Sequence, residues 1–346
     1  MKIAGRNVGA GAAPLVIAEM SGNHNQSLER ALAIVEAAAK AGAHALKLQT
    51  YTADTMTLDL RENEFLIKDP GSLWKGKSLY QLYQEAHTPW DWHRPIFERA
   101  RKLGMIAFSS PFDESAVDFL QGLDAPCYKI ASFENTDLPL VRKVAATGKP
   151  MIISTGMASA EELDETVRAA RGAGAKDIVL LKCTSTYPAS PEETNILTIP
   201  DMRRRFGCEV GLSDHTMGIG AAVAAVALGA CALEKHFTLR RADGGVDSAF
   251  SLEPAEMKSL VEESERAWRS LGAVHYGVTA TEKNSLVFRR SLYVVKDLKA
   301  GDVLTRDNLR VIRPGLGLPP KYFELMLGKA VKRDVKRGTP LTQDLV

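Results

Sequence analysis

Short apolar runs alternate with amphipathic segments from Leu15 to about Leu271. Eight such runs occur, and each is short enough to be a buried strand. The segments between most of them have the apolar spacing of helices, and several end in glycine, which is typical of a helix end. The eight runs read LVIAEMS, HALKLQTY, MIAFSSPF, CYKIAS, PMIISTGM, IVLLKCTSTYP, EVGLSDHT and ALEKHFTL.

This repeat predicts a parallel (β/α)8 TIM barrel over residues 1–272. Parallel strands need helical crossovers, and eight strands can close the sheet. The pattern predicts a helix in SLERALAIVEAAAKAG, and another in TPWDWHRPIFERARKLG with Thr88 as its cap and Pro89 at its first position. The joint from Thr52 to Ala86 is too long for a simple loop, so we expect a lid or an added rim helix over the barrel mouth.

The residue composition and the hydrophobic pattern of the chain change after Leu271. Residues 273–284 have the composition of a linker, and residues 285–346 give short strands interrupted by Gly, Asp and Pro turns. We therefore expect a second, small and mostly β domain after the barrel.

The composition of the chain limits the classes of partner that it can bind. The chain has 346 residues, 45% of them hydrophobic and 25% charged, with a formal net charge of +2. The sequence has no stripe of basic residues of the kind that binds nucleic acids or membranes, so small molecules are the expected partners. The four cysteines show no C-x-x-C spacing, and no apolar run has the length of a signal peptide or a membrane span. These features favour a cytoplasmic protein.

Polar side chains gather where the predicted strands end. In ALKLQT, Leu46 and Leu48 share one face while Lys47 and Gln49 share the other, so the lysine and the amide should enter the barrel lumen. The carboxyl ends of barrel strands form the active-site face. The other polar residues at these ends are Glu19, Ser109, Ser110, Lys129, Ser132, Ser154, Thr155, Thr184, Ser185, Tyr187, Asp214, His215, Glu234, Lys235 and His236.

Two kinds of chemistry follow from these residues. Two lysines and three serines form an anion cradle that suits a phosphate and a carboxylate. His215 and His236 end neighbouring strands about 4.8 Å apart, so their imidazoles can share a divalent ion with water or substrate in the other positions. The cradle consists of Lys47, Ser110, Lys129, Ser132 and Ser154.

Simpler interpretations exist for single residues. A lone lysine at a strand end is more often ion-paired than catalytic, and a lone histidine is more often a core residue. The barrel also fits a Schiff-base aldolase or lyase with Lys129 or Lys235 as nucleophile, which needs no metal and leaves the paired histidines unexplained. The joint pattern of polar strand ends favours a phosphate and metal site.

At these residues the chain resembles the sialic acid synthase family over nearly its whole length. The motifs that carry the resemblance are IAEMSGNHNQSLERA, ALKLQTYTADTMTL, FSSPFDE, YKIASFENTDLPL, ISTGMAS, KCTSTYPA, GLSDHTMG, EKHFTL and RPGLGLPP. Within the family it is most similar to members that act on 2,4-diacetamido-2,4,6-trideoxy-L-altrose. Ser185 stands where neuraminate synthases usually have asparagine, which indicates a sugar with different substituents.

The resemblance implies a transferase. It would condense phosphoenolpyruvate with an open-chain N-acetylated sugar aldehyde, giving a nine-carbon 2-keto acid and phosphate. Members that make N-acetylneuraminate or legionaminate by the same mechanism are the alternatives. The C-terminal domain is similar to the antifreeze-like (SAF) domain of this family, and a carbohydrate- or ice-binding module is a weaker, non-enzymatic alternative, because it leaves the polar barrel mouth unexplained.

The family's roles map onto this chain by motif. The anion cradle would bind phosphoenolpyruvate, and His215 and His236 would bind Mn²⁺, with Mg²⁺ or Co²⁺ as alternatives. Arg313 would reach the barrel of a partner subunit, which requires a domain-swapped homodimer. The sugar would lie against Gln49, Glu134, Ser185, Tyr187, Phe288 and Arg313. The catalytic set would be Glu19, Lys47, Lys129, Glu234 and Asp247, in which the lysines compensate phosphate charge and a carboxylate positions water or moves a proton.

Overall fold

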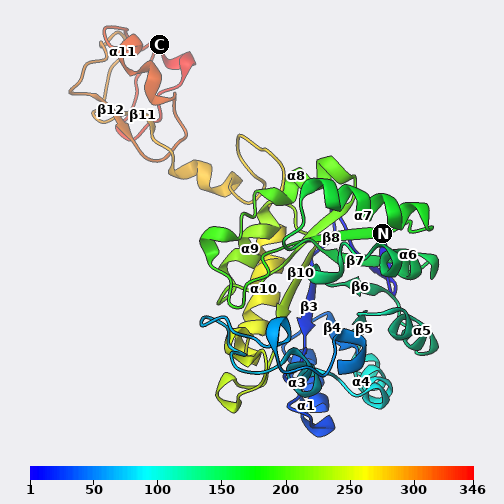
Figure 1. Ribbon diagram of the computed structural model, residues 1–346. Coiled ribbons are helices and arrows are strands. Elements are labelled where there is room, and N and C mark those ends of the chain that lie inside the picture. The colour runs from blue at the N-terminus through cyan, green and yellow to red at the C-terminus, as the bar shows by residue number, and fades with distance from the viewer. The chain divides into compact units, whose positions relative to one another are not determined.

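The computed structural model describes residues 1–346 (Figure 1). The chain forms two compact units, Met1–Gly272 and Ala273–Val346. None of its helices combines the length and the apolar character needed to cross a bilayer.

The first unit is a closed barrel of eight parallel strands, as the repeat of apolar runs predicts. Each strand pairs with its neighbours in chain order, and β10 closes the ring against β3 with His236 opposite Glu19. The strands are β3 (Leu15–Glu19), β4 (Ala45–Thr50), β5 (Ile106–Pro111), β6 (Tyr128–Ile130), β7 (Met151–Ser154), β8 (Ile178–Cys183), β9 (Glu209–Ser213) and β10 (Ala232–His236). All eight predicted strands are therefore confirmed.

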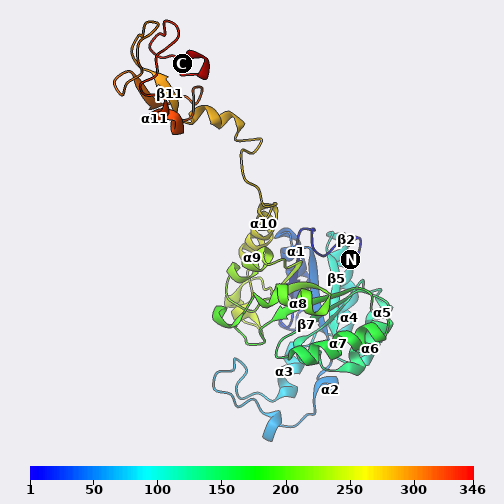
Figure 2. The same cartoon turned by 90° about the horizontal axis from the view of Figure 1, so that it is seen from above.

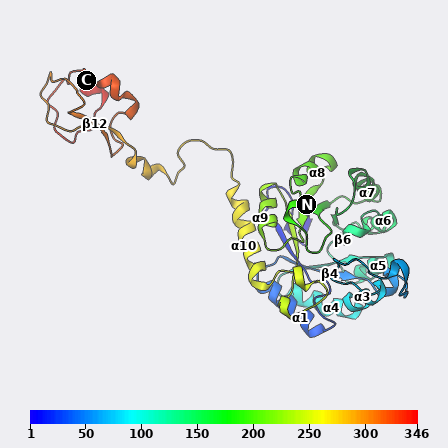
Figure 3. The same cartoon turned by 60° about the vertical axis from the view of Figure 1, so that its left-hand side comes forward.

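Eight helices form a ring around the barrel (Figure 3). They are α1 (Leu28–Lys40), α4 (Trp90–Lys102), α5 (Glu114–Gly122), α6 (Leu138–Ala146), α7 (Ala160–Gly172), α8 (Thr198–Phe206), α9 (Gly220–Ala227) and α10 (Pro254–Ser270). The side chain of Ser27 caps α1 by accepting a hydrogen bond from the Arg30 amide. One predicted cap is wrong: the N-cap of α4 is Pro89, and the hydroxyl of Thr88 contacts Nε2 of His24 at 3.2 Å.

Strand alternation divides the apolar residues into two layers. Leu46 and Leu48 pack against the helices in the larger cluster, as predicted. Residues on the other strand face, such as Ile17 and Phe108, fill the amino end of the lumen. The short hairpin of β1 (Lys2–Ile3) and β2 (Arg6–Asn7) adds Ile3 to this plug. The amino end is thus closed by apolar packing, and polar side chains remain for the carboxyl end.

The segment between β4 and α4 adds structure to the barrel mouth. It contains α2 (Ala53–Met56) and α3 (Leu79–Ala86), and it lies at the end of the barrel away from the N-terminus (Figure 2). Ser78 and Gln81 form a capping box that starts α3. The expected rim helix is therefore α3.

The second unit has its own small core. Two antiparallel strands, β11 (Ser291–Val294) and β12 (Leu309–Ile312), pack with α11 (Phe323–Met326) around Leu292, Leu309 and Leu341. Most of its remaining chain is turns and isolated bridges, in agreement with the predicted mostly-β domain. All four cysteines of the chain are free thiols, and all are buried in the barrel unit.

Candidate active site

Four charged side chains meet inside the carboxyl half of the lumen. Lys47 forms an ion pair with Glu19, and its Nζ lies 3.6 Å from Oε1 of Glu234. Nζ of Lys129 lies 3.5 Å from the same Glu234 oxygen. None of the four side chains is more than 5% exposed. Two cations and two anions are therefore held together in a water-poor site, where electrostatic interactions are strong.

Burial and charge move the pKa values of this quartet in different directions. Burial raises the pKa of Glu19 to about 7, although Lys47 opposes the shift. Burial also acts to raise the pKa of Glu234, but Lys129 and Lys47 outweigh it and the value falls below the ordinary range. Two carboxylates with separated pKa values can serve as a proton carrier and a fixed anion.

Hydroxyl groups surround the lysines. Lys47 donates to Oγ of Ser110 at 3.4 Å, and Ser213 donates to Oε1 of Glu234 at 3.0 Å. Ser154 is 1% exposed, and its Oγ has no hydrogen-bond partner. Ser132 accepts a hydrogen bond from the amide of Gly156 at 3.2 Å. All members of the predicted anion cradle lie at the carboxyl ends of β4 to β7.

The absence of a side chain at Gly156 shapes this region. A Cβ atom there would lie 2.1 Å from Oγ of Ser185 and 2.7 Å from Oγ of Ser132. Glycine thus lets two hydroxyls, from the segments after β6 and β8, approach one backbone position.

The two predicted metal ligands face one another. The ring centroids of His215 and His236 are 5.3 Å apart. Nδ1 of His215 contacts the carbonyl oxygen of Thr184 at 2.8 Å, which makes Nδ1 the protonated nitrogen and leaves the lone pair on Nε2. Nδ1 of His236 is buried without a hydrogen-bond partner, and it lies 3.6 Å from Oδ2 of Asp247.

These histidines fit a weakly held divalent ion. Burial, together with the nearby cations His215 and Lys47, lowers the pKa of His236 well below its ordinary value, so its imidazole is neutral. No three His, Cys, Asp or Glu side chains converge closely enough to hold a metal alone. Two imidazoles could therefore supply only part of a coordination shell, and water or substrate oxygens would supply the rest.

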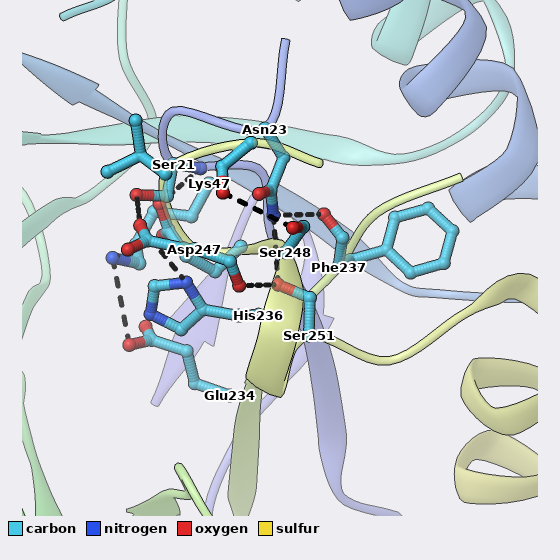
Figure 4. A network of polar contacts seen from close by, with 12 residues as sticks. Ser21, Asn23, Lys47, Glu234, His236, Phe237, Asp247, Ser248 and Ser251 are labelled. Carbon is cyan, nitrogen blue, oxygen red and sulfur yellow. Dashed lines mark hydrogen bonds and ion pairs between the residues drawn. The ribbon is translucent and has the colours of Figure 1, made fainter. Parts of the chain in front are cut away.

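A hydrogen-bonded loop supports the histidine pair. Asp247, next to the 3₁₀ turn Ser248–Phe250, accepts a hydrogen bond from Ser21, and Figure 4 shows its carboxylate between Ser21 and His236. The amide of Asn23 donates to Oγ of Ser251 and to the carbonyl oxygen of Phe237, both at 2.9 Å. Asn23 thus ties this loop to the end of β10.

A cavity of about 370 Å³ opens above the charged quartet. Gln49, Ser132, Glu134, Tyr187, His236 and Asp247 line it, so three of the six residues predicted to bind the sugar, Gln49, Glu134 and Tyr187, share one space. Burial raises the pKa of Glu134 to about 7. Tyr187 packs on His215 with ring centroids 4.4 Å apart. The predicted sugar contacts Phe288 and Arg313 belong to the second unit, and their roles stay predictions.

The structure corrects the prediction for Lys235. Its Nζ donates to Oδ2 of Asp214 at 3.0 Å, and both side chains are 1% exposed. Lys235 also donates to the carbonyl oxygen of Thr216. Glu234 and His236 occupy the lumen face of β10, and Lys235 therefore occupies the opposite, helix-facing side. It holds the segment that carries His215 and cannot be a lumenal nucleophile.

Several site residues were missed in the sequence. Ser21 and Ser213 were not singled out, because an isolated serine carries little signal. Sγ of Cys183 lies 3.9 Å from Nδ1 of His215. Burial acts to raise the pKa of this thiol, but the hydrogen bond and charge of His215, with help from Ser132 and Lys129, together lower it to about 7. Three tryptophans, Trp74, Trp90 and Trp92, were expected either to stack on the sugar or to pack the inserted segment on the barrel. Trp74 lines the cavity and donates to the carbonyl oxygen of Val246 at 3.0 Å. By contrast, Trp90 and Trp92 pack on Phe119 and His24.

The chain is similar in sequence to known protein families and to characterised enzymes. The model of the NeuB family matches residues 34–276, and that of the SAF domain matches residues 289–346. A pseudaminic acid synthase of Campylobacter jejuni is 45% identical over 328 residues, which cover 95% of each chain. An N,N'-diacetyllegionaminic acid synthase of the same species is 35% identical, covering 93% of this chain and 97% of the other.

A solved structure is also similar. The N-acetylneuraminic acid synthetase of Leptospira borgpetersenii, crystallised with citrate, superimposes with a TM-score of 0.74 at 29% identity. The match covers 83% of this chain and 94% of that chain. The likeness therefore extends over most of both chains.

Proposed function

The chain belongs to the NeuB family of nonulosonate synthases, and on that premise we propose that it makes pseudaminic acid from phosphoenolpyruvate and 2,4-diacetamido-2,4,6-trideoxy-L-altrose. The methylene carbon of phosphoenolpyruvate bonds to the aldehyde carbon of the open-chain sugar. Water adds to the neighbouring carbon, and phosphate leaves by cleavage of the carbon–oxygen bond. The product is a nine-carbon 2-keto acid.

The choice among family activities depends on the relatives. Identity to a pseudaminic acid synthase is 45%, against 35% to a legionaminic acid synthase of the same species. This difference supports the diacetamido altrose as substrate. Legionaminate or N-acetylneuraminate synthesis by the same mechanism is the alternative.

One observation carries the proposed chemistry: the lysine pair, from β4 and β6, and the imidazole pair, from β10 and the segment after β9, lie at the same end of the barrel. Lys47 and Lys129 converge on Glu234 two residues before His236. A phosphate bound by these lysines would have its negative charge compensated while the carbon–oxygen bond breaks. Oγ of Ser154 has no partner, so it is free to donate to that anion.

Three carboxylates lie beside the lysines and the histidines. Glu234 lies between the two lysines and favours the charged form of both, although burial still lowers the pKa of Lys129. Glu19 pairs with Lys47 at the end of β3, and Asp247 lies beside His236. We assign to this set the positioning of the attacking water and the transfer of its proton.

His215 and His236 would hold the divalent ion, which we propose to be Mn²⁺, with Mg²⁺ or Co²⁺ as alternatives. Such an ion, when bound, acts as a Lewis acid toward a carbonyl oxygen. The chain's own contribution is to keep the imidazole of His236 neutral and to orient His215: the carbonyl oxygen of Thr184 contacts Nδ1 of His215, and Tyr187 packs on the same ring.

The sugar would lie in the cavity above these groups. Gln49, Glu134 and Tyr187 line its wall and supply amide, carboxyl and hydroxyl groups for polar substituents. Ser185 lies close by, as its approach to Gly156 requires. Phe288 and Arg313 complete the proposed sugar contacts from a partner subunit.

Exposed apolar side chains support a homodimer with exchanged second units. The loops after β6 to β9 expose Phe133, Met157, Leu197 and Met217, each more than half exposed. The second unit exposes apolar side chains as well, including Phe288 at 62%. Clustered exposed apolar residues mark interaction surfaces. In the proposed dimer each set covers the other across subunits.

Co-expression of two inactive variants should test this arrangement. Lys129→Met removes a barrel lysine, and Arg313→Ala removes the proposed contact from the partner. If the second units are exchanged, each mixed dimer places one intact barrel beside an intact second unit, so one of its two sites is competent and the purified mixed dimer should have roughly half of wild-type activity. Phosphate release by separately tagged, doubly purified protein measures it. Activity no higher than that of the better single variant would refute action across subunits.

A panel of sugars tests the proposed substrate. The enzyme is incubated with phosphoenolpyruvate, Mn²⁺ and one sugar, either the diacetamido altrose, its legionaminic counterpart or N-acetylmannosamine. We expect phosphate release with the altrose to exceed that with the others by about 10²-fold, because wrongly placed polar groups stay unpaired. Turnover restricted to N-acetylmannosamine would contradict the assignment.

A further inference from the structure

The cavity at the barrel mouth has two chemically different halves. One half carries the polar groups described above, which come from the strand ends. The other half is a wall of six apolar side chains: Met56, Ile67, Leu79, Leu82, Ala86 and Phe112. Five of the six come from the segment between β4 and α4, so this segment supplies a surface of opposite character to the catalytic strands.

Helix α3 sets the geometry of the apolar wall. Leu79, Leu82 and Ala86 are spaced by three and four residues, which places them on one face of the helix. The capping box of Ser78 and Gln81 fixes the start of the helix. Three of the six wall residues therefore belong to one preformed helix face.

Two contacts fix the segment to the catalytic loops. Nε1 of Trp74 donates to the carbonyl oxygen of Val246, the neighbour of Asp247. Gly22, in the loop after β3, lies so close that a Cβ atom there would be 3.1 Å from Cα of Ala86. The apolar wall therefore has a defined position relative to Asp247 and His236, which line the same cavity.

The chemistry of the wall determines what it can accept. None of the six side chains has a hydrogen-bond donor, and their only acceptor is the weakly accepting thioether sulfur of Met56. A hydroxyl placed against them loses its water contacts without replacement, which weakens binding. A methyl group in the same place is removed from water, which strengthens binding. The two substituents are thus separated by a large difference in binding free energy.

We infer that the apolar wall selects the sugar by its methyl groups, and that Leu79 is a specificity-determining residue that contacts the methyl at C6. This inference rests on the proposed function, whose substrate is a 6-deoxy sugar with acetamido groups, and adds the side chains that recognise its methyl groups. A sugar that carries a hydroxyl at C6 is rejected because that hydroxyl faces the wall.

A pair of sugars that differ in one oxygen atom tests the inference. The substrates are 2,4-diacetamido-2,4,6-trideoxy-L-altrose and its 6-hydroxy counterpart, and kcat/KM is measured from phosphate release. For the wild type we expect a preference of about 10- to 100-fold for the 6-deoxy sugar. In Leu79→Asn, whose amide can pair with the hydroxyl, the preference should fall by about tenfold or more.

Control variants distinguish a failure of the apolar wall's role from a failure of the proposed function. Leu58→Asn changes a residue of the same segment that is 63% exposed and outside the cavity lining, so it should keep the wild-type ratio. Met56→Gln provides a second wall variant if thermal unfolding shows that Leu79→Asn is misfolded. A wild type without preference, or wall variants with the wild-type ratio, would refute the wall's role. Turnover of neither sugar would refute the proposed function and the inference with it.

Discussion

Lys129→Met should lower kcat/KM for phosphoenolpyruvate by about 10²- to 10³-fold, the loss expected when a preorganised charge in a water-poor site is removed. The side chain is 2% exposed and lies 3.5 Å from Glu234. Methionine keeps the length and apolar stem of lysine but carries no charge, so Glu234 and an incoming phosphate would share Lys47 alone. Steady-state phosphate release measures the effect.

Lys182→Met is the matched control for this variant. Lys182 is a half-buried lysine on β8, which is separated from β6 by β7, and its Nζ donates to the carbonyl oxygen of Cys183 and to Thr184 at 3.0 Å. It lines the separate cavity between α7 and α8. We expect a change of less than about threefold for this variant. Equal losses in both variants would show that Lys129 acts through stability.

Removal of divalent ions should lower turnover by about 10³-fold, since a Lewis acid contributes several kcal/mol to the stabilisation of developing charge. The His236→Ala variant should reproduce this loss and should also weaken Mn²⁺ binding by more than about tenfold, because only two imidazoles are available to hold the ion. The electron paramagnetic resonance signal of free Mn²⁺ measures binding without reference to activity.

His275→Ala serves as the comparison variant, since His275 is an exposed histidine of the second unit. It should bind Mn²⁺ with wild-type affinity. If His236→Ala binds Mn²⁺ as tightly as His275→Ala does, or if activity survives exhaustive chelation, the proposed cofactor is wrong.

The barrel could be predicted from the sequence because its physical cause is local. Buried parallel strands must be short apolar runs, and their crossovers must be helices with one apolar face. The same alternation placed Lys47 in the lumen and Leu46 and Leu48 against the helices. Applied to ALEKH, it also separates Lys235 from Glu234 and His236, so the side on which Lys235 lies could have been deduced from the strand pattern alone.

Other features depend on contacts that no local pattern encodes. The apolar wall brings together Met56, Ile67 and Leu82 from a segment of mixed turns and short helices, whose irregular spacing gives no periodic signal. The hydrogen bond from Ser21 to Asp247 joins residues 226 positions apart. Thr88 has the residue type of a helix cap, yet its hydroxyl contacts His24 in the folded chain. Tertiary contacts override local preference at this position.

The burial of all four thiols has a practical consequence for spectroscopy. Cys127, Cys183, Cys208 and Cys231 are at most 7% exposed, so reagents that alkylate surface sulfhydryls would meet almost no native target. A single cysteine introduced on the surface of each unit would then be the preferred attachment point for a spin label or a fluorophore. Native cysteines would therefore take up almost no label, and the distance between labels on the two units could be measured in solution.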